Sequence, residues 1–245
     1  MTFLRQYRDL LSMELRSMRG EVPMIAVIQL AFTLGFVLGF GYLVPGMTGE
    51  TARYIVTGTA TQGLVTIGLV LLPQLLAQAR REGRLDYLLA MPISREAYLL
   101  ALVSVVGIMA LPGVLFCLLF GAWHYGVALA WSPLVIPVVL LGIASLAGVG
   151  IALAMYSPHQ QVTNALTQLI IFYVLFFAPV LMPREQLPEL LQWTARLAPP
   201  TYAAEALRAA VTDLPGAEAG PALAAMALFA LGSAALGAIA MRRRT

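Results

Sequence analysis

Apolar residues occur in long uncharged blocks separated by short polar segments. A helix needs about 20 mostly apolar residues to cross a bilayer, and six blocks fit that length. They cover residues 22–44, 54–77, 97–122, 132–156, 163–182 and 221–241. Polar hinges at residues 123–133 and 157–161 separate the third, fourth and fifth blocks, because no charged residue occurs between Glu96 and Arg184. The pattern predicts an all-α polytopic membrane protein with six transmembrane helices, formed as a single domain over residues 1–245.

The segment ahead of the first block has the periodicity of an amphipathic helix. One face of this helix is apolar and consists of Phe3, Leu4, Tyr7, Leu10, Leu11, Leu15 and Met18. The other face is polar and consists of Arg5, Arg8, Asp9, Ser12, Arg16 and Arg19. Such a pattern is typical of a helix that lies along a membrane surface with its arginines among anionic lipid headgroups. We therefore expect an interfacial helix over residues 1–21. A simple charged anchor for the first span is the alternative interpretation.

The composition agrees with a membrane protein and narrows its chemistry. The 245 residues are 60% hydrophobic and 11% charged, whereas about a quarter of the residues in soluble domains are charged. All fifteen basic residues are arginine, so this chain carries neither the phosphate-binding-loop lysine of ATPases nor a Schiff-base lysine. The net charge of +3 comes from arginines that flank apolar blocks, as expected for residues that determine membrane topology. We therefore do not expect nucleic-acid binding.

The arginines also predict orientation, because basic residues that flank spans stay on the cytoplasmic side. Eleven belong to the amino terminus, the loop after the second span and the carboxyl terminus: Arg5, Arg8, Arg16, Arg19, Arg80, Arg81, Arg84, Arg95, Arg242, Arg243 and Arg244. Four belong to the other side: Arg53, Arg184, Arg196 and Arg208. With six spans, both termini are expected in the cytoplasm and the protein in the inner (plasma) membrane.

The residues that membrane enzymes use are missing from the spans. The two histidines, His124 and His159, belong to hinges on opposite sides of the membrane, too far apart to share a metal. No carboxylate falls inside a predicted span, which disfavours a proton-coupled carrier. We expect no catalytic residue, metal or cofactor on this chain. Small residues at a spacing of four, Gly35 and Gly39 in the first span and Ala144 and Gly148 in the fourth, instead predict close helix packing, as does the alanine- and glycine-rich sixth span.

Uncharged polar residues in the second and fifth spans are candidates for lining a substrate path. These are Thr59, Gln62 and Thr66, and then Asn164, Thr167 and Gln168. Cross-linking between neighbouring helices is the simpler interpretation, because isolated polar residues in bundles usually bind a neighbouring helix.

The loop at residues 80–95 has the pattern of a docking element. Leu85, Leu88 and Leu89 form an apolar face on a short helix with charges around it. Pro92 ends that helix, and Ser94 can cap the next span. An amphipathic turn of this kind predicts a protein surface against which the leucines are buried.

This loop resembles the coupling-helix segment of ABC-2 type transporter permeases, with Glu82-Gly83-x-Leu85-Asp86-x-Leu88-Leu89-x-x-Pro92-x-x-Arg95. A second stretch is similar to the signature between the fifth and sixth spans of that family. It runs through Ala178-Pro179-Val180-Leu181-Met182-Pro183, Leu187-Pro188-x-x-Leu191-x-Trp193 and Leu197-x-Pro199-x-Thr201-Tyr202-x-x-Glu205-x-x-Arg208. One departure is Arg84, where the family commonly carries a small hydroxyl residue.

The resemblance implies an exporter built from two permeases, with two cytoplasmic ATPase subunits that hold ATP and Mg²⁺ and dock on the coupling helices. Leu85, Leu88 and Leu89 are then assigned to the docking contact, and Glu82 and Asp86 to pairing with basic groups of the ATPase. The complete set of expected coupling residues is Arg81, Glu82, Gly83, Leu85, Asp86, Leu88, Leu89 and Pro92.

The same resemblance implies that residues 184–216 form short external helices that cap the path. Candidate gate residues in them are Trp193, Tyr202, Glu205 and Arg208. Because the spans carry no charged pocket, an amphipathic drug-like or lipid-like substrate is favoured, with a saccharide as the alternative. A six-helix membrane enzyme or scaffold is the competing class of function.

Overall fold

The computed structural model of the chain describes residues 3–44, 46–91, 93–177, 180–181, 188–214 and 219–242. Within these residues all regular structure is helical, which confirms the all-α expectation. The elements in chain order are α1 (Phe3–Ser17), η1 (Met18–Gly20), α2 (Val22–Leu43), α3 (Gly49–Thr66), η2 (Ile67–Leu71), α4 (Leu72–Arg81), α5 (Arg84–Ala90), α6 (Arg95–Tyr125), α7 (Val135–Tyr156), α8 (Gln160–Phe177), α9 (Glu189–Arg196), α10 (Pro199–Val211) and α11 (Ala219–Arg242).

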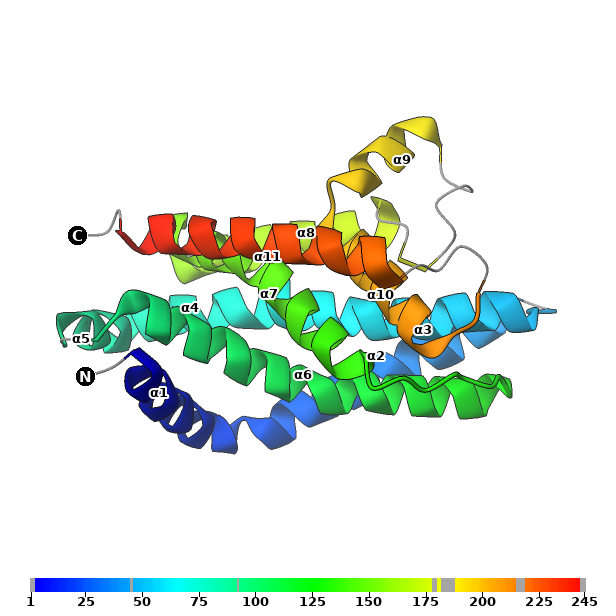
Figure 1. Ribbon diagram of the computed structural model, residues 1–245, viewed down its shortest axis with the longest axis horizontal. Coiled ribbons are helices and arrows are strands. Elements are labelled where there is room, and N and C mark those ends of the chain that lie inside the picture. Colours follow the sequence, from blue (N-terminus) through cyan, green and yellow to red (C-terminus); the bar gives the residue numbers. More distant parts are fainter. Residues whose placement is uncertain are drawn as a thin grey trace.

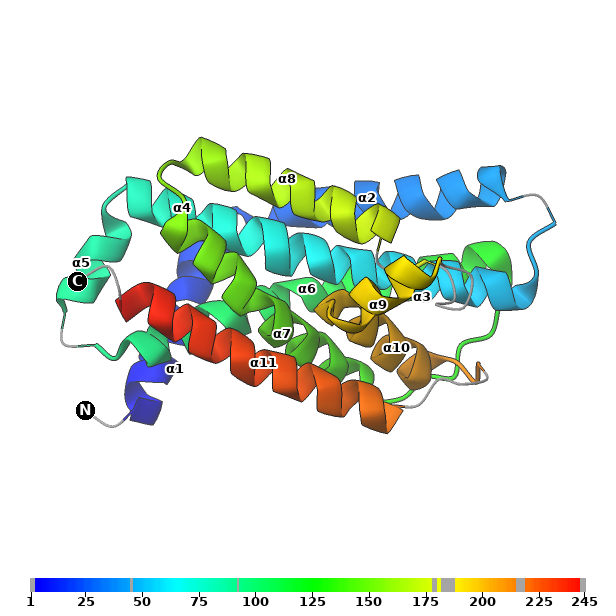
Figure 2. The same cartoon turned by 90° about the horizontal axis from the view of Figure 1, so that it is seen from above.

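The long helices run along the length of the molecule, and successive ones point in opposite directions (Figures 1 and 2). The start of α1, all of α5 and the end of α11 lie at one end of this bundle, which we call the α5 end. Five described segments are long and apolar enough to cross a membrane: Val22–Leu43, Gly49–Arg81, Arg95–Tyr125, Val135–Tyr156 and Ala219–Met241. They support a multi-pass membrane protein.

The expected fifth span corresponds to α8, which is not among these five segments. Its first turns are polar, with Gln160, Gln161 and Asn164. The expected span continues to residue 182, but residues 178–179 and 182 lie outside the described part of the chain. The count of six spans therefore stays a prediction.

The second span is longer than its apolar block because a capped polar turn precedes it. The Thr48 side chain accepts a hydrogen bond from Thr51 N at 3.2 Å, which starts α3 at Gly49. Further along, Pro73 has no N–H with which to continue the α-helical ladder, and the π turn η2 ends two residues before it. The segment Gly49–Arg81 is nevertheless continuous, and most of its spanning part is buried inside the bundle.

The expected close packing is confirmed at Ala144 and Gly148, between α7 and α11, but not at Gly35 and Gly39 of α2, which have no neighbour in this chain within 4 Å of an added Cβ atom. A Cβ atom added to Gly148 would lie 1.9 Å from the Ser233 carbonyl oxygen of α11, so only glycine fits there. The Ser233 hydroxyl donates a hydrogen bond to the Ala144 carbonyl at 2.9 Å and accepts one from the Gly148 N–H. Small residues thus bring the two backbones into direct contact.

Two short helices, α9 and α10, separate α8 from α11, as expected for residues 184–216. Pro199 and Pro200 occupy the first turn of α10, where a missing N–H costs no helical hydrogen bond. α10 packs against α3, α7 and α11, and Ala203, Ala204, Ala206 and Ala210 are buried there. In Figure 1, α9 projects from the side of the bundle, whereas α10 lies within its length.

Candidate functional site

The α5 end of the bundle carries a polar tip formed by the α4–α5 turn. Gly83 has a φ of +72° and makes the left-handed turn between the two helices, a conformation that favours glycine. The Gln78 side-chain amide donates to Glu82 Oε1 at 2.8 Å and steadies the turn. Beyond it, Asp86 and Tyr87 are exposed, with Tyr87 69% accessible. These side chains, with the exposed Arg81 and Glu82, form the surface that we call the α5 tip.

The expected docking role of the leucines requires a correction. Leu85 and Leu88 are 1% and 6% exposed, because they belong to the main hydrophobic core of this chain. Leu88 lies near Leu10 of α1 and Tyr98 of α6 around a very small cavity. The protein surface that covers these leucines is therefore the chain itself. The side chain of Leu89 and all of Pro92 lie outside the described residues.

Arg80 fastens the end of α4 to the end of α7. Its Nη1 donates to the Ala154 carbonyl at 2.6 Å and to the Ser157 carbonyl at 2.8 Å. These oxygens belong to the last turn and end of α7, where carbonyls lack helical partners and the helix dipole favours a cation. The sequence indicated Arg80 only as a topology signal. Its structural role is that of a carbonyl cap.

Arg84 fastens the start of α5 to α1. Its Nη1 donates to Ser17 Oγ at 3.0 Å, and its Nη2 lies 3.7 Å from Glu14 Oε2. The Glu14 side chain is fully buried. Burial raises the pKa of the Glu14 carboxyl, and the Arg84 guanidinium opposes this by lowering it. The departure from the family pattern at Arg84 therefore has a partner within the chain.

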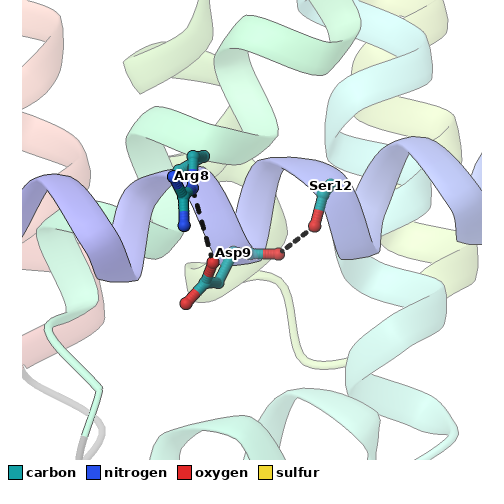
Figure 3. A network of polar contacts seen from close by, with 3 residues as sticks. All are labelled: Arg8, Asp9 and Ser12. Atoms are coloured by element: carbon teal, nitrogen blue, oxygen red, sulfur yellow. Dashed lines mark hydrogen bonds and ion pairs between the residues drawn. The ribbon is translucent and has the colours of Figure 1, made fainter.

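Glu14 is a residue that the helical wheel could have revealed. It follows Leu10 by four residues and precedes Met18 by four, so all three share one side of α1 and of the turn η1 that continues it, and all three are buried. The opposite side of α1 is solvated. Figure 3 shows Arg8 and Asp9 there, with Arg8 Nε 3.7 Å from Asp9 Oδ1. Both side chains are largely exposed, so this ion pair contributes little stability.

The start of α6 joins two further elements at the α5 end. Ser94 caps α6 as expected, since its hydroxyl accepts a hydrogen bond from Ala97 N at 3.3 Å. The Ser94 N–H in turn donates to Gln6 Oε1 of α1 at 3.3 Å. Arg95 Nη1 donates to the Met241 carbonyl of α11 at 3.4 Å. The loop that carries α5 thus contacts α1, α7 and α11 through three different arginines.

The candidate path residues do not converge on one site. Thr59 and Thr66 line a cavity between α2, α3, η2 and α6. Gln62 is close to them in the chain and is only 1% exposed, but it is not among the residues that line the cavity. Asn164 and Gln168 are exposed on α8, whereas Thr167 is buried and donates its hydroxyl hydrogen bond to the Asn164 carbonyl.

The candidate gate residues lie in different surroundings. Trp193 of α9 is 67% exposed. On α10, the Tyr202 ring packs against Phe229 of α11, with ring centroids 5.7 Å apart. Arg208 is buried, with its guanidinium 4.4 Å from the centre of the Tyr54 ring. Glu205, on the same helix, is half-buried.

Arg208 also holds the chain segment that follows α8. It donates a hydrogen bond to the Val180 carbonyl. The same carbonyl would lie 2.4 Å from a Cβ atom added to Gly58 of α3, so glycine allows the segment to approach this helix. Gly58 is a residue that sequence reasoning missed, because the approach brings together residues more than a hundred positions apart.

The described residues show no group of three or more His, Cys, Asp or Glu side chains that could hold a metal ion. A family model described as ABC-2 type transporter matches residues 5–212 of the chain. The match includes most of α1, the α5 tip and all of α10. No curated protein matches the chain.

Proposed function

The chain belongs to the ABC-2 type transporter family and is a transmembrane permease of an ABC transporter, and we propose that a separate ATPase subunit drives it to export an amphipathic substrate. This chain contains no lysine, so it cannot supply the phosphate-binding lysine with which such ATPases hold nucleotide. ATP and Mg²⁺ are therefore assigned to the partner. The family is a transporter family whose membrane subunit is generally not catalytic.

The observation that carries the proposal is the α5 tip. Its exposed side chains, among them Asp86 and Tyr87, stand on a helix whose buried face is fixed to the rest of the chain. Arg84 connects that helix to α1, and Arg80 connects the end of the preceding helix α4 to α7, so a push on the tip reaches several helices at once. A docked ATPase needs such a rigid lever, because interfaces and packed cores transmit discrete shifts.

The orientation and the sixth span belong to the same proposal. The start of α1 and the end of α11 lie at the α5 end (Figures 1 and 2), which agrees with an even number of membrane crossings. We place that end in the cytoplasm, because the arginine-rich segments gather there. α8 then acts as the fifth span and α1 as an interfacial helix, in a multi-pass protein of the inner membrane.

The path is proposed to form between two copies of the permease. α2 and α8 present mostly exposed apolar faces, and Gly35 and Gly39 of α2 have no neighbour within 4 Å of an added Cβ atom. A second copy that packs on α2 would bury these small residues. The exposed Asn164 and Gln168 of α8 would then face the path rather than lipid.

An amphipathic substrate is favoured because the larger described cavities are lined mainly by apolar side chains. In inverted vesicles that contain the permease and its ATPase, ATP should drive uptake of amphiphiles. Uptake of a hydrophilic glycan, with no uptake of any amphiphile, would contradict this part of the proposal.

The docking role is tested with two matched tyrosines. Tyr87 of the α5 tip is 69% exposed, and Tyr42, in the last turn of α2, is 87% exposed. Helix α5 and the end of α2 lie at opposite ends of the bundle (Figure 2). Tyr87→Ala combined with Asp86→Arg should abolish ATP-dependent transport, whereas Tyr42→Ala should leave it near the wild-type rate. Both variants should insert and fold normally, because neither removes a buried contact. Full transport by the double variant would contradict the assignment of the ATPase to this surface.

A further inference from the structure

A cavity of about 150 Å³ lies inside a single copy of the chain, between α2, α3, η2 and α6. Ile28 and Phe32 of α2, Val70 of η2, and Val114 and Cys117 of α6 contribute to its apolar wall. None of the residues that line it carries a charge. The cavity therefore excludes ionic ligands, because an unpaired ion would lose its hydration there without compensation.

Thr59 gives this cavity a polar group without a partner. The side chain lines the cavity and is 1% exposed, and its hydroxyl makes no hydrogen bond. Other threonines of α3 behave differently. Thr57, Thr61 and Thr66 each donate to the carbonyl four residues earlier, at 2.8, 2.9 and 2.9 Å. A buried hydroxyl is normally hydrogen-bonded. The Thr59 hydroxyl is therefore available to bond a polar group of a bound ligand.

Gly63, one turn after Thr59, keeps the space open. It lines the cavity, and a Cβ atom added to it would meet nothing within 4 Å. The π turn η2 forms part of the same wall through Ile67 and Val70. Single π turns inside longer helices occur frequently at functional sites.

We propose that this cavity binds a compact, uncharged, ring-shaped molecule that bears one hydroxyl, of which phenol is the simplest example. An apolar cavity of roughly 150 Å³ accommodates a single six-membered ring. The ligand hydroxyl bonds to Thr59, and the ring packs against Phe32 and the aliphatic wall. The site lies within one permease copy, so it is separate from a path formed between two copies, and it does not depend on the ATPase.

Photolabelling of the purified chain in liposomes, without ATPase or nucleotide, tests this site. The probe is 4-hydroxyphenyl trifluoromethyl diazirine, and mass spectrometry locates the labelled residues. Thr59→Val removes the hydroxyl while keeping the shape, and Thr57→Val is its control on the same helix. Gly63→Leu fills the cavity, and Gly232→Leu makes the same change on α11, away from the cavity, where it has equal room.

Saturable labelling of residues 63, 66 and 117 is expected in the wild-type protein and in the two control variants. Thr59→Val should raise the half-saturating probe concentration about two- to twelvefold, which corresponds to the loss of one net hydrogen bond. Gly63→Leu should remove saturable labelling. Labelling that increases linearly along lipid-facing residues, or an unchanged half-saturation in Thr59→Val, would overturn the proposal.

The two proposals fail separately. A chain that labels as expected but recruits no ATPase keeps the ligand site and contradicts the proposed function. A chain that transports with ATP but shows no saturable labelling keeps the function and contradicts the ligand site.

Discussion

Replacing Arg80 with methionine should loosen the attachment of α4 to α7, whereas the same replacement at Arg81 should not. Arg80 donates two short hydrogen bonds to carbonyls at the end of α7, and Arg81 is exposed beside it. Both substitutions remove one positive charge from the same loop. The pair therefore separates the effect of the carbonyl cap from the effect of charge on membrane topology.

The magnitude follows from the two bonds. A hydrogen bond from a charged donor contributes about 1.5–3 kcal/mol, and the half-buried position of Arg80 lets water replace part of the loss. A decrease of about 2–4 kcal/mol in the free energy of unfolding is expected for Arg80→Met. For a chain of this size that corresponds to a fall in Tm of roughly 4–16 °C. For Arg81→Met, a change within about 0.5 kcal/mol is expected.

Thermal unfolding in detergent, followed by circular dichroism, measures both variants. Amide exchange at the end of α7 gives a local readout, and it should speed up only in Arg80→Met. Arg80→Lys should recover part of the stability, because an ammonium keeps the charge but lacks the guanidinium geometry. Equal Tm values for Arg80→Met and Arg81→Met would refute the capping role.

Three further predictions concern buried contacts. Burial raises the pKa of the Glu14 carboxyl, so the folded protein holds the carboxyl proton more tightly than the unfolded chain, and stability falls as pH rises above about 4.5. Glu14→Gln should therefore flatten the pH dependence of Tm, and Arg84→Met should steepen it. An unchanged pH dependence in both variants would contradict the burial account. Gly148→Leu should prevent folding or lower Tm strongly, because its Cβ would meet a carbonyl of α11 at 1.9 Å, whereas Gly232→Leu should be tolerated in the same detergent assay. Arg208→Gln should speed amide exchange at residues 180–181 by roughly tenfold or more, since it removes a charged hydrogen bond and a cation–π contact, and unchanged exchange would disprove its anchoring role.

Hydrophobic periodicity predicted the helices because a bilayer imposes length and composition directly. Small-residue spacing likewise predicted the packing at Ala144 and Gly148, and hydroxyl chemistry predicted the Ser94 cap. These features depend on residues close together in the chain. Local sequence therefore carried enough information for them.

The candidate site was less predictable, because its contacts join distant segments. An amphipathic face shows that Leu85 and Leu88 must be covered, but not by what, and the cover is the chain itself, with Leu10 of α1 beside Leu88. Arg80 reads the same as Arg81 in sequence. The two arginines differ only in the folded chain, where Arg80 bonds to α7 carbonyls that lie more than seventy residues later in the sequence.

Purification of the tagged permease from its native membrane tests the central claim most directly. The measurement is whether an ATPase polypeptide accompanies the permease in a fixed ratio and hydrolyses ATP. We predict one ATPase for each permease copy, and loss of that ATPase when Asp86→Arg and Tyr87→Ala are combined in a protein that keeps its Tm. A stable permease complex without any ATPase, isolated from membranes in which ABC ATPases are present, would contradict the account.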